Sequence, residues 1–307
     1  MGISLHHISK SFKSVTALKD ISFDVKSGEL FGLIGPDGAG KTTLFRVLTT
    51  LLLADEGTAS VAGMDVVTDY KAIRNSVGYM PGRFSLYHDL TVEENLNFFA
   101  TIFNTTLEEN YDLIKEIYVQ IEPFKNRRAG KLSGGMKQKL ALCCALIHKP
   151  KVLFLDEPTT GVDPVSRKEF WEMLKRLQQK DITMLVSTAY MDEASLCDRV
   201  ALIQDGTILE IDTPQRIIEK FPRTIYNVKA SETYRLLKDL EKYEATHSVY
   251  PFGEFLHFTS KDAAFTSEEL IQFLEQEHHT EIEVSEAIPT IEDSFMTLSK
   301  EHSNNGN

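Results

Sequence analysis

The stretch LFGLIGPDGAGKTT, residues 30–43, decides the fold of this 307-residue chain. Its first five residues are continuously apolar, which is typical of a strand buried on both faces of a parallel sheet. The rest fits the phosphate-loop template G-x-x-x-x-G-K-[ST]. A helix is predicted from Lys41 to about Leu53. A buried strand that enters a glycine-rich loop and a helix that leaves it are the context in which this motif binds phosphate.

The chemistry of this loop follows from its residue types. Glycines let backbone N–H groups turn inward onto phosphate oxygens, and the helix N-terminus adds partial positive charge. Lys41 supplies a full charge, and the Thr42 hydroxyl can reach Mg²⁺. A carboxylate near phosphates is unfavourable, so Asp37 is expected to point outward. The predicted nucleotide-binding residues are Gly35, Pro36, Asp37, Gly38, Ala39, Gly40, Lys41, Thr42 and Thr43.

A second buried strand, VLFLDE at residues 152–157, delivers two carboxylates at its C-terminal end. Ligands in open α/β sheets bind at this end of the strands. Asp156 is predicted to hold Mg²⁺ through water, and Glu157 to polarise an attacking water as the catalytic residue. Two adjacent acids are a weak signal alone but a strong one after a phosphate loop.

The segment LSGGM contains a second anion-binding helix start, formed by a serine side chain and two glycine N–H groups. Within one chain it has no obvious phosphate to bind. In a dimer it could face the nucleotide that the other subunit holds. Its residues are Leu132, Ser133, Gly134, Gly135 and Met136.

These motifs resemble the nucleotide-binding subunit of ABC transporters over residues 1–220, and Gly161-Val-Asp163 stands at the spacing of that family's D-loop. The resemblance implies ATP and Mg²⁺ as cofactors, Phe12 stacked on adenine, and two subunits that sandwich two ATP molecules. It also implies transmembrane permease subunits as partners. The implied fold is an α/β P-loop NTPase domain over residues 1–221, with a parallel-core sheet, an antiparallel β subdomain and a helical subdomain at about 86–150.

Two positions depart from the family pattern. Gly82 stands where the family usually has a glutamine that touches Mg²⁺ or the attacking water, and Ala189 where it usually has a histidine that contacts the γ-phosphate. Loss of groups that orient water or move protons typically costs about 10²–10⁴-fold in rate. We therefore expect this chain's own site to bind ATP but hydrolyse it weakly. The signature is intact, which favours a heterodimer with a second ABC ATPase subunit; a homodimer is the alternative.

Beyond Pro222 the pattern changes to strand-helix-strand-strand-helix-strand, the split βαβ or ferredoxin-like arrangement, over residues 222–300. This part resembles the C-terminal extension of drug-exporter ATPases of the daunorubicin-resistance type, including the segment PTIEDSF at residues 289–295. The phosphate-loop variant also resembles one half of fused two-ATPase exporter subunits. A short helix is expected at Thr290–Leu298, followed by a disordered tail at 301–307.

Composition excludes several classes of protein. The net charge is −12, and residues 222–307 carry seven Lys and Arg against 16 Asp and Glu, so we expect no nucleic-acid partner. No apolar run is long enough to span a membrane, and Cys143, Cys144 and Cys197 form no disulfide pattern. The chain is thus expected at the cytoplasmic face of the inner or plasma membrane, as a peripheral subunit.

Other ATPases of this fold fit less well. A two-ATPase translation factor needs a second phosphate loop, and a chromosome-structure or repair ATPase needs a long heptad coil or metal-binding cysteines; neither feature is present. A non-hydrolysing, ATP-gated dimerisation or regulatory module stays open, because the residues at 82 and 189 suit it. The preferred hypothesis is an ATPase that powers an ABC-type exporter. The sequence does not reveal which compound is transported.

Overall fold

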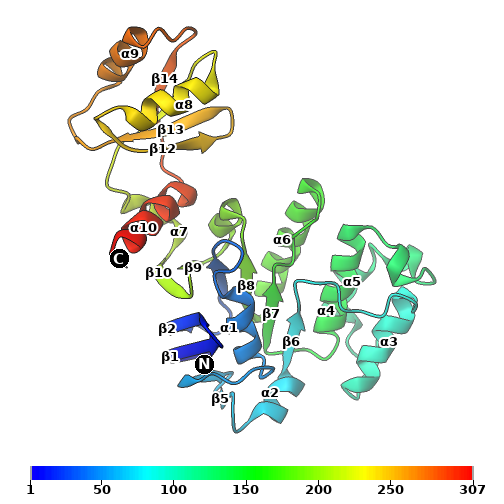
Figure 1. Cartoon of the computed structure of the whole chain (residues 1–307). Coiled ribbons are helices and arrows are strands. Elements are labelled where there is room, and N and C mark those ends of the chain that lie inside the picture. Colours follow the sequence, from blue (N-terminus) through cyan, green and yellow to red (C-terminus); the bar gives the residue numbers. More distant parts are fainter. Residues whose placement is uncertain (1, 306–307) are drawn as a thin grey trace. The chain divides into compact units, whose positions relative to one another are not determined.

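The computed structural model describes residues 2–305, which form two compact units (Figure 1). The first unit comprises residues 2–215 together with 298–305, and the second comprises residues 216–297. Among residues 2–305 no helix is both long and apolar enough to cross a membrane.

The first unit begins with a four-stranded antiparallel sheet in the order β2-β1-β4-β5. Strands β1 and β2 form a long hairpin with several register shifts, and β1 also pairs with β4. Every second side chain of β2 near its C-terminal end is buried, as the alternation of Ile21, Phe23 and Val25 predicts. The strands are β1 Ile3–Phe12, β2 Val15–Val25, β4 Glu56–Val61 and β5 Met64–Asp65.

The second sheet of this unit has six strands in the order β10-β9-β3-β8-β7-β6. All pairings are parallel except the hairpin of β9 and β10, which confirms the predicted parallel core. Strands β3 and β7 are buried at every position. The strands are β3 Leu30–Ile34, β6 Val77–Met80, β7 Val152–Asp156, β8 Thr183–Thr188, β9 Arg199–Gln204 and β10 Thr207–Asp212.

Helices cover and extend these sheets. Helix α1 contacts strands of both sheets, so the main core lies around it and between the sheets. Helices α3, α4 and α5 gather beyond β6 as the predicted helical subdomain (Figure 1). The helices are α1 Lys41–Leu48, α2 Tyr70–Ser76, α3 Val92–Ile102, α4 Tyr111–Tyr118, α5 Gly134–Leu146, α6 Pro164–Gln178 and α7 Pro214–Glu219, with 3₁₀ turns η1 Glu122–Phe124, η2 Ala129–Lys131 and η3 Met191–Leu196.

The second unit contains a four-stranded sheet in the order β12-β13-β11-β14 with every neighbour antiparallel, as the split βαβ pattern predicts. Helices α8 and α9 bury their apolar stripes in its core. The elements are β11 Ile225–Lys229, α8 Thr233–Lys242, β12 Thr246–Phe252, β13 Phe255–Ser260, α9 Ser267–Gln276 and β14 Glu283–Ala287, and α10 Ile291–Asn305 follows them.

Two predicted boundaries are wrong. Helix α1 ends at Leu48 instead of about Leu53, because Thr50 adopts a left-handed conformation with φ 63° and the chain turns there. Helix α10 runs to Asn305, well past the predicted end at Leu298, so residues 301–305 of the expected disordered tail are helical. No glycine or proline interrupts Ser299–Asn305, and Lys300 and Glu301 favour helix. Residues 306 and 307 lie outside the described residues.

Candidate functional site

The phosphate loop joins β3 to α1 at the carboxyl edge of the parallel strands, where the sequence places it. Gly40 has φ 103°, and a Cβ atom there would lie 2.5 Å from the Ala17 carbonyl oxygen. Only glycine fits this close approach between the loop and β2. Asp37 is exposed. The loop therefore has the tight, backbone-lined shape that presents N–H groups to phosphate.

Lys41 is the cation of this loop and is almost completely buried, with 3% of its surface exposed. Its Nζ donates to the carbonyl oxygens of Gly35 at 2.7 Å and Pro36 at 2.9 Å. It also pairs with Glu157 Oε1 at 3.1 Å. The structure thus brings together the two residues that the sequence singles out as the phosphate-binding cation and the catalytic base.

Asp156 ends β7 with its carboxylate buried. Ser187 Oγ donates to Asp156 Oδ1 at 2.6 Å, and the Thr42 hydroxyl is a second hydrogen-bond partner. Burial raises the pKa of Asp156 above its usual 3.8, although both hydrogen bonds oppose that shift. A buried carboxylate beside a threonine hydroxyl is a donor set that suits a hard cation.

Glu157 adopts an unusual backbone conformation, with φ 50° in the left-handed region. Few residues other than glycine adopt it, and it is held here by surrounding contacts. Its N–H donates to the carbonyl oxygen and to Oγ of Ser187, at 3.1 and 3.0 Å. The turn aims the side chain back at Lys41. The strained backbone of Glu157 therefore holds its carboxylate in one direction, toward Lys41.

Ser187 is a site residue that the sequence analysis missed. It contacts both acidic residues of the strand end, through Asp156 Oδ1 and the Glu157 N–H. A signal was present, since Ser187 is a polar residue at the end of the apolar stretch Ile182–Ser187. Parallel strands end at the same edge of the sheet, so such a residue meets the ends of its neighbours.

Gly82 lies against the strand end that carries the two acids. A Cβ atom there would lie 3.0 Å from the Asp156 carbonyl oxygen and 3.7 Å from Glu157 Cβ. The position predicted to be degenerate is therefore next to the candidate catalytic residues. With glycine, it contributes no side chain to them.

Ala189 follows β8 directly and is half-buried. The residue before it, Thr188, accepts a hydrogen bond from the Gly35 N–H at its carbonyl oxygen, at 3.2 Å. The position is thus next to the phosphate loop, but a methyl group cannot donate to a phosphate. His148 does not replace the absent histidine, because it stacks on Phe103 with ring centroids 3.7 Å apart and Nε2 faces the Val77 carbonyl oxygen at 3.1 Å.

The signature segment begins α5, with Ser133 as its N-cap residue. Ser133 Oγ accepts from the Met136 N–H at 3.3 Å. Leu132 is buried beneath this start, whereas Ser133 and Gly134 are exposed. The helix start is therefore open for an anion that another molecule supplies.

The D-loop lies beside the signature in the same chain. Asp163 caps α6 by accepting from the Ser166 N–H at 3.0 Å, and this hydrogen bond lowers the pKa of Asp163 below its usual 3.8. A Cβ atom on Gly135 would lie 2.8 Å from Ser166 Oγ. The starts of α5 and α6 are in close contact and present Ser133 and Asp163 together.

Phe12 lies at the end of β1, where it pairs with Val15 in the hairpin. Its ring is 46% exposed, with Lys10 Nζ 5.6 Å from the centroid. An exposed aromatic face is compatible with base stacking. Its role toward adenine stays a prediction.

Comparisons with known proteins agree with this geometry. Residues 18–160 match the family model described as "ABC transporter". The chain is 38% identical to the probable multidrug ABC transporter ATP-binding protein YbhF of Escherichia coli, over 96% of this chain and 52% of that protein. It is 39% identical to the Nod factor export ATP-binding protein I of Burkholderia lata, over 71% of this chain and 72% of that protein. The chain thus spans about half the length of the first of these relatives.

Solved structures show the same fold. A dimeric ATP-binding cassette in a post-hydrolysis state, bound to ADP and Pi, superposes with a TM-score of 0.62 at 25% identity, over 69% of this chain and 98% of that one. An ATP-binding subunit of an ABC transporter superposes with a TM-score of 0.66 at 26% identity, over 72% and 93%. The phosphate loop, the paired acids and the signature all lie within residues 18–160, the range that matches the family model. The chain belongs to the ATP-binding subunits of ABC transporters, the ABC-type ATPases.

Proposed function

We propose that this chain binds and hydrolyses ATP to power an ABC-type exporter through ATP-driven dimerisation. Export is favoured because the names of two relatives concern multidrug transport and Nod factor export. Its partners are then transmembrane permease subunits and a second ABC ATPase subunit. Its place is at the cytoplasmic face of the inner or plasma membrane, as a peripheral subunit.

Mg²⁺ is the metal that this site fits. Thr42 and the buried carboxylate of Asp156 would hold it, because a hydroxyl and a carboxylate supply the oxygen ligands that a hard cation takes. When bound with ATP, Mg²⁺ neutralises charge that develops on the phosphate oxygens. Lys41 and the loop N–H groups would bind the phosphates themselves.

The contact between Lys41 and Glu157 suggests how ATP activates the base. Lys41 Nζ is shared by two loop carbonyls and the Glu157 carboxylate. Phosphate oxygens are stronger acceptors than carbonyl oxygens because they carry charge. ATP that takes over Lys41 would release Glu157 from this ion pair and leave its carboxylate to polarise a water.

The observation that carries the finer proposal is Gly82. A Cβ atom added to Gly82 would lie 3.0 Å from the carbonyl oxygen of Asp156, but glycine has no side chain that could orient a water molecule there. Ala189 likewise offers no hydrogen-bonding group to the γ-phosphate. Glu157 alone polarises a water without fixing its direction, so turnover at this chain's own phosphate loop is expected to be weak. We favour a heterodimer in which Ser133, Gly134 and Gly135 complete the working site on the partner.

A groove beside Gly82 is our candidate for the permease contact. Its volume is about 200 Å³, and it lies between β6 and the helical subdomain, lined by Met80, Pro81, Leu86, Phe99 and Phe103 among others. Such an apolar groove suits a short apolar segment of a membrane subunit. Because Pro81 precedes Gly82 directly, a segment bound there would act on the strand end with the two acids.

Steady-state phosphate release from the complete transporter tests the asymmetry. Ser133→Arg in this chain places a bulky cation in the signature and should abolish most of the ATPase activity. Glu157→Gln in this chain should change it little, because the partner's site does most of the work. If Glu157→Gln is the more damaging variant, this chain's own site is the working one and the asymmetric proposal is wrong.

The residues at 82 and 189 also favour a second candidate, a non-hydrolysing ATP-gated dimerisation or regulatory module. It predicts that the complete complex binds ATP without turnover above background. Turnover that depends on Ser133 would exclude it.

A further inference from the structure

Glu193, in the 3₁₀ turn η3, is a buried carboxylate that the ATPase motifs do not include. Only 2% of its surface is exposed. Oε1 accepts from Thr159 Oγ1 at 2.8 Å and from Arg167 Nε at 3.1 Å, and Oε2 accepts from Thr188 Oγ1 at 2.5 Å. A buried carboxylate is retained at low cost only when such donors satisfy it.

The three donors come from three different parts of the ATP site. Thr159 stands two residues after Glu157, in the turn that follows β7. Thr188 ends β8 and stands directly before Ala189. Arg167 lies in the first turns of α6, one turn after Asp163. One carboxylate therefore joins the catalytic strand end, the switch position and the D-loop helix.

The contacts through Thr188 and Arg167 continue further, to the phosphate loop and to the signature helix. The Thr188 carbonyl oxygen accepts from the Gly35 N–H of the phosphate loop at 3.2 Å. At the other end, Ser166 precedes Arg167 and lies against Gly135, whose Cβ position is 2.8 Å from Ser166 Oγ. Glu193 thus lies on a continuous path of contacts from the phosphate loop to the start of the signature helix.

We propose that Glu193 is a positioning residue of this ATPase, which couples nucleotide at the phosphate loop to helix α6. Through Thr159, Thr188 and Arg167 its carboxylate ties the ends of β7 and β8 to the helix that follows Asp163. The coupling rests on the proposed ATP binding, but it does not depend on how fast this chain's own site hydrolyses ATP.

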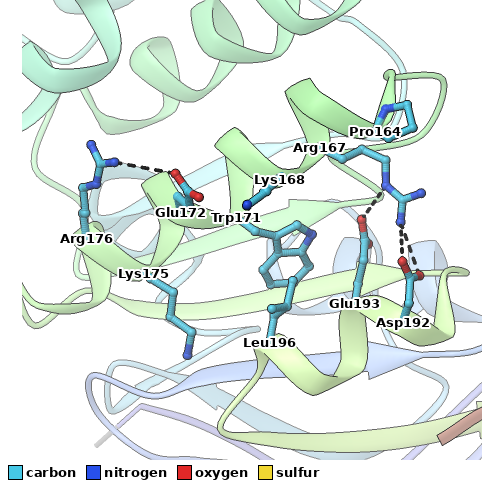
Figure 2. A pocket seen from close by; sticks show the side chains of 10 residues that line it. All are labelled: Pro164, Arg167, Lys168, Trp171, Glu172, Lys175, Arg176, Asp192, Glu193 and Leu196. Carbon is cyan, nitrogen blue, oxygen red and sulfur yellow. Dashed lines mark hydrogen bonds and ion pairs between the residues drawn. The ribbon is translucent and has the colours of Figure 1, made fainter. Parts of the chain in front are cut away.

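The charge of Glu193 is part of the argument. Its charged neighbour is Arg167, whose guanidinium also contacts Asp192 at 3.3 Å (Figure 2). The same guanidinium lies 3.9 Å from the centre of the Tyr190 ring. The Asp192 side chain is 76% exposed, so its ion pair is screened by water, whereas that of Glu193 is not. Replacing Glu193 by glutamine would remove the negative charge that pairs with Arg167 and put an N–H₂ group in place of one of the two oxygens that accept from Arg167, Thr159 and Thr188.

Trp171 provides a built-in reporter of this coupling, since it is the chain's single tryptophan. It lies on α6 and lines the same groove of about 620 Å³ as Arg167 and Glu193 (Figure 2). The ring is 3% exposed, and its Nε1 has no hydrogen-bond partner among the described residues. Indole emission depends on its surroundings, so a shift of α6 against η3 should change it.

The test measures ATP affinity and Trp171 emission on the full-length chain. Affinity is taken from displacement of a trinitrophenyl-ATP probe by Mg·ATP, and tryptophan emission is followed in a separate titration without the probe. In the native chain, emission should change with the same midpoint as binding. Glu193→Gln should keep ATP affinity within about threefold and lose most of the emission change. Asp192→Asn is the matched control, because it touches the same guanidinium from an exposed position and should keep the native response.

Thr159→Val provides a second variant, should Glu193→Gln fail to fold. It keeps the side-chain shape and removes one donor, so we expect a reduced emission change at unchanged affinity. Native-like emission changes in these variants would overturn the coupling, as would native ATP binding with no change in Trp171 emission. A native chain that binds no ATP would overturn the proposed function as well.

Discussion

At the scale of single residues, the candidate site depends on a few charges held in low-dielectric surroundings. Lys41 and Asp156 are buried, and Glu157 is partly buried, with its carboxylate 3.1 Å from the Lys41 ammonium. Charges in such surroundings interact more strongly than they do in water. Small displacements of these groups are therefore expected to matter more than losses of exposed charges elsewhere.

We predict that Lys41→Ala weakens ATP affinity at least about tenfold, or about 1.4 kcal/mol, because it removes the cation that meets the β- and γ-phosphates. Isothermal titration with Mg·ATP measures this. Lys229→Ala is the control, since it makes the same charge change in an exposed ion pair with Glu254 of the second unit. Equal affinities for the two variants would contradict the phosphate-loop assignment.

At the scale of elements, the close approach of loops and strands determines which residues are tolerated. The phosphate loop touches β2 at Ala17, and the Ala39 carbonyl oxygen accepts from the Gly206 N–H of the β9–β10 turn at 3.1 Å. These contacts join the loop to both sheets of the first unit. The shape of the phosphate loop therefore depends on its contacts with β2 and with the β9–β10 turn as well as on its own sequence.

Two glycines of the loop give a matched pair of variants. Both have positive φ, 81° at Gly38 and 103° at Gly40, but a Cβ atom at Gly38 meets nothing within 4 Å, whereas one at Gly40 meets the Ala17 carbonyl oxygen at 2.5 Å. Gly38→Ala should cost about 1 kcal/mol of unfolding free energy, from backbone strain alone. Gly40→Ala should cost clearly more and weaken ATP binding. Urea unfolding and nucleotide titration of both variants check this, and equal costs would refute it.

In the second unit, one carboxylate joins three elements. Asp293, near the start of α10, accepts hydrogen bonds from His257 of β13 at 2.6 Å, from Tyr250 of β12, and from both N–H and Oγ1 of Thr290 at 2.7 and 2.6 Å. Its side chain is fully buried. The segment PTIEDSF therefore has a structural role here, because its aspartate fastens α10 to the sheet.

The pKa of Asp293 gives a prediction about acid stability. Burial alone would raise this pKa, but the hydrogen bonds from His257, Thr290 and Tyr250 outweigh it and hold the pKa below 3.8. The unfolded chain then binds the proton more tightly, so this stabilisation is present above pH 3.8 and is lost as pH falls through the lower native pKa. We expect Asp293→Asn to lower the unfolding free energy by about 2 kcal/mol at pH 7 and by less at pH 3. Urea unfolding at both pH values measures this, and an equal loss at both would contradict it.

At the scale of the whole molecule, the distribution of charge and the two separate hydrophobic cores both change near residues 215–222. The separate cores of the two units have no residue in common, and the acidic excess is concentrated beyond Pro222. The contacts divide the chain at residue 215 or 216, six residues before the predicted boundary, and return residues 298–305 to the first unit. Whether residues 1–221 and 222–300 fold independently stays a prediction.

Limited proteolysis tests whether residues 1–221 and 222–300 fold independently. If the second unit is independent, cleavage should occur near Phe221–Thr224 and leave a folded fragment of residues 1–220 that still binds ATP. Circular dichroism and nucleotide titration of the purified fragment, compared with the intact chain, give the answer. A fragment that unfolds would show that residues after 220, including the helical stretch 298–305, belong to the fold of the cassette.

The sequence by itself determined the features that depend on local chemistry. The loop at residues 35–43, the acids at 156 and 157 and the cap at Ser133 follow from residue type and spacing. Strand β3 also stands where the pattern predicts it. The strand order of the second unit follows from the order of its elements, because few topologies accommodate a split βαβ.

Only the tertiary structure decided the contacts between residues far apart in the chain. Ser187 against Asp156, the Gly82 backbone against the strand end, and Thr159 and Arg167 against Glu193 join residues that are 26 to 75 positions apart, and no local pattern specifies such pairs. The same holds for the left-handed turn at Thr50, where α1 stops although the apolar sequence continues. Local propensity fixes which element a segment forms, but burial and hydrogen bonding in the folded chain decide where that element ends and which side chains meet.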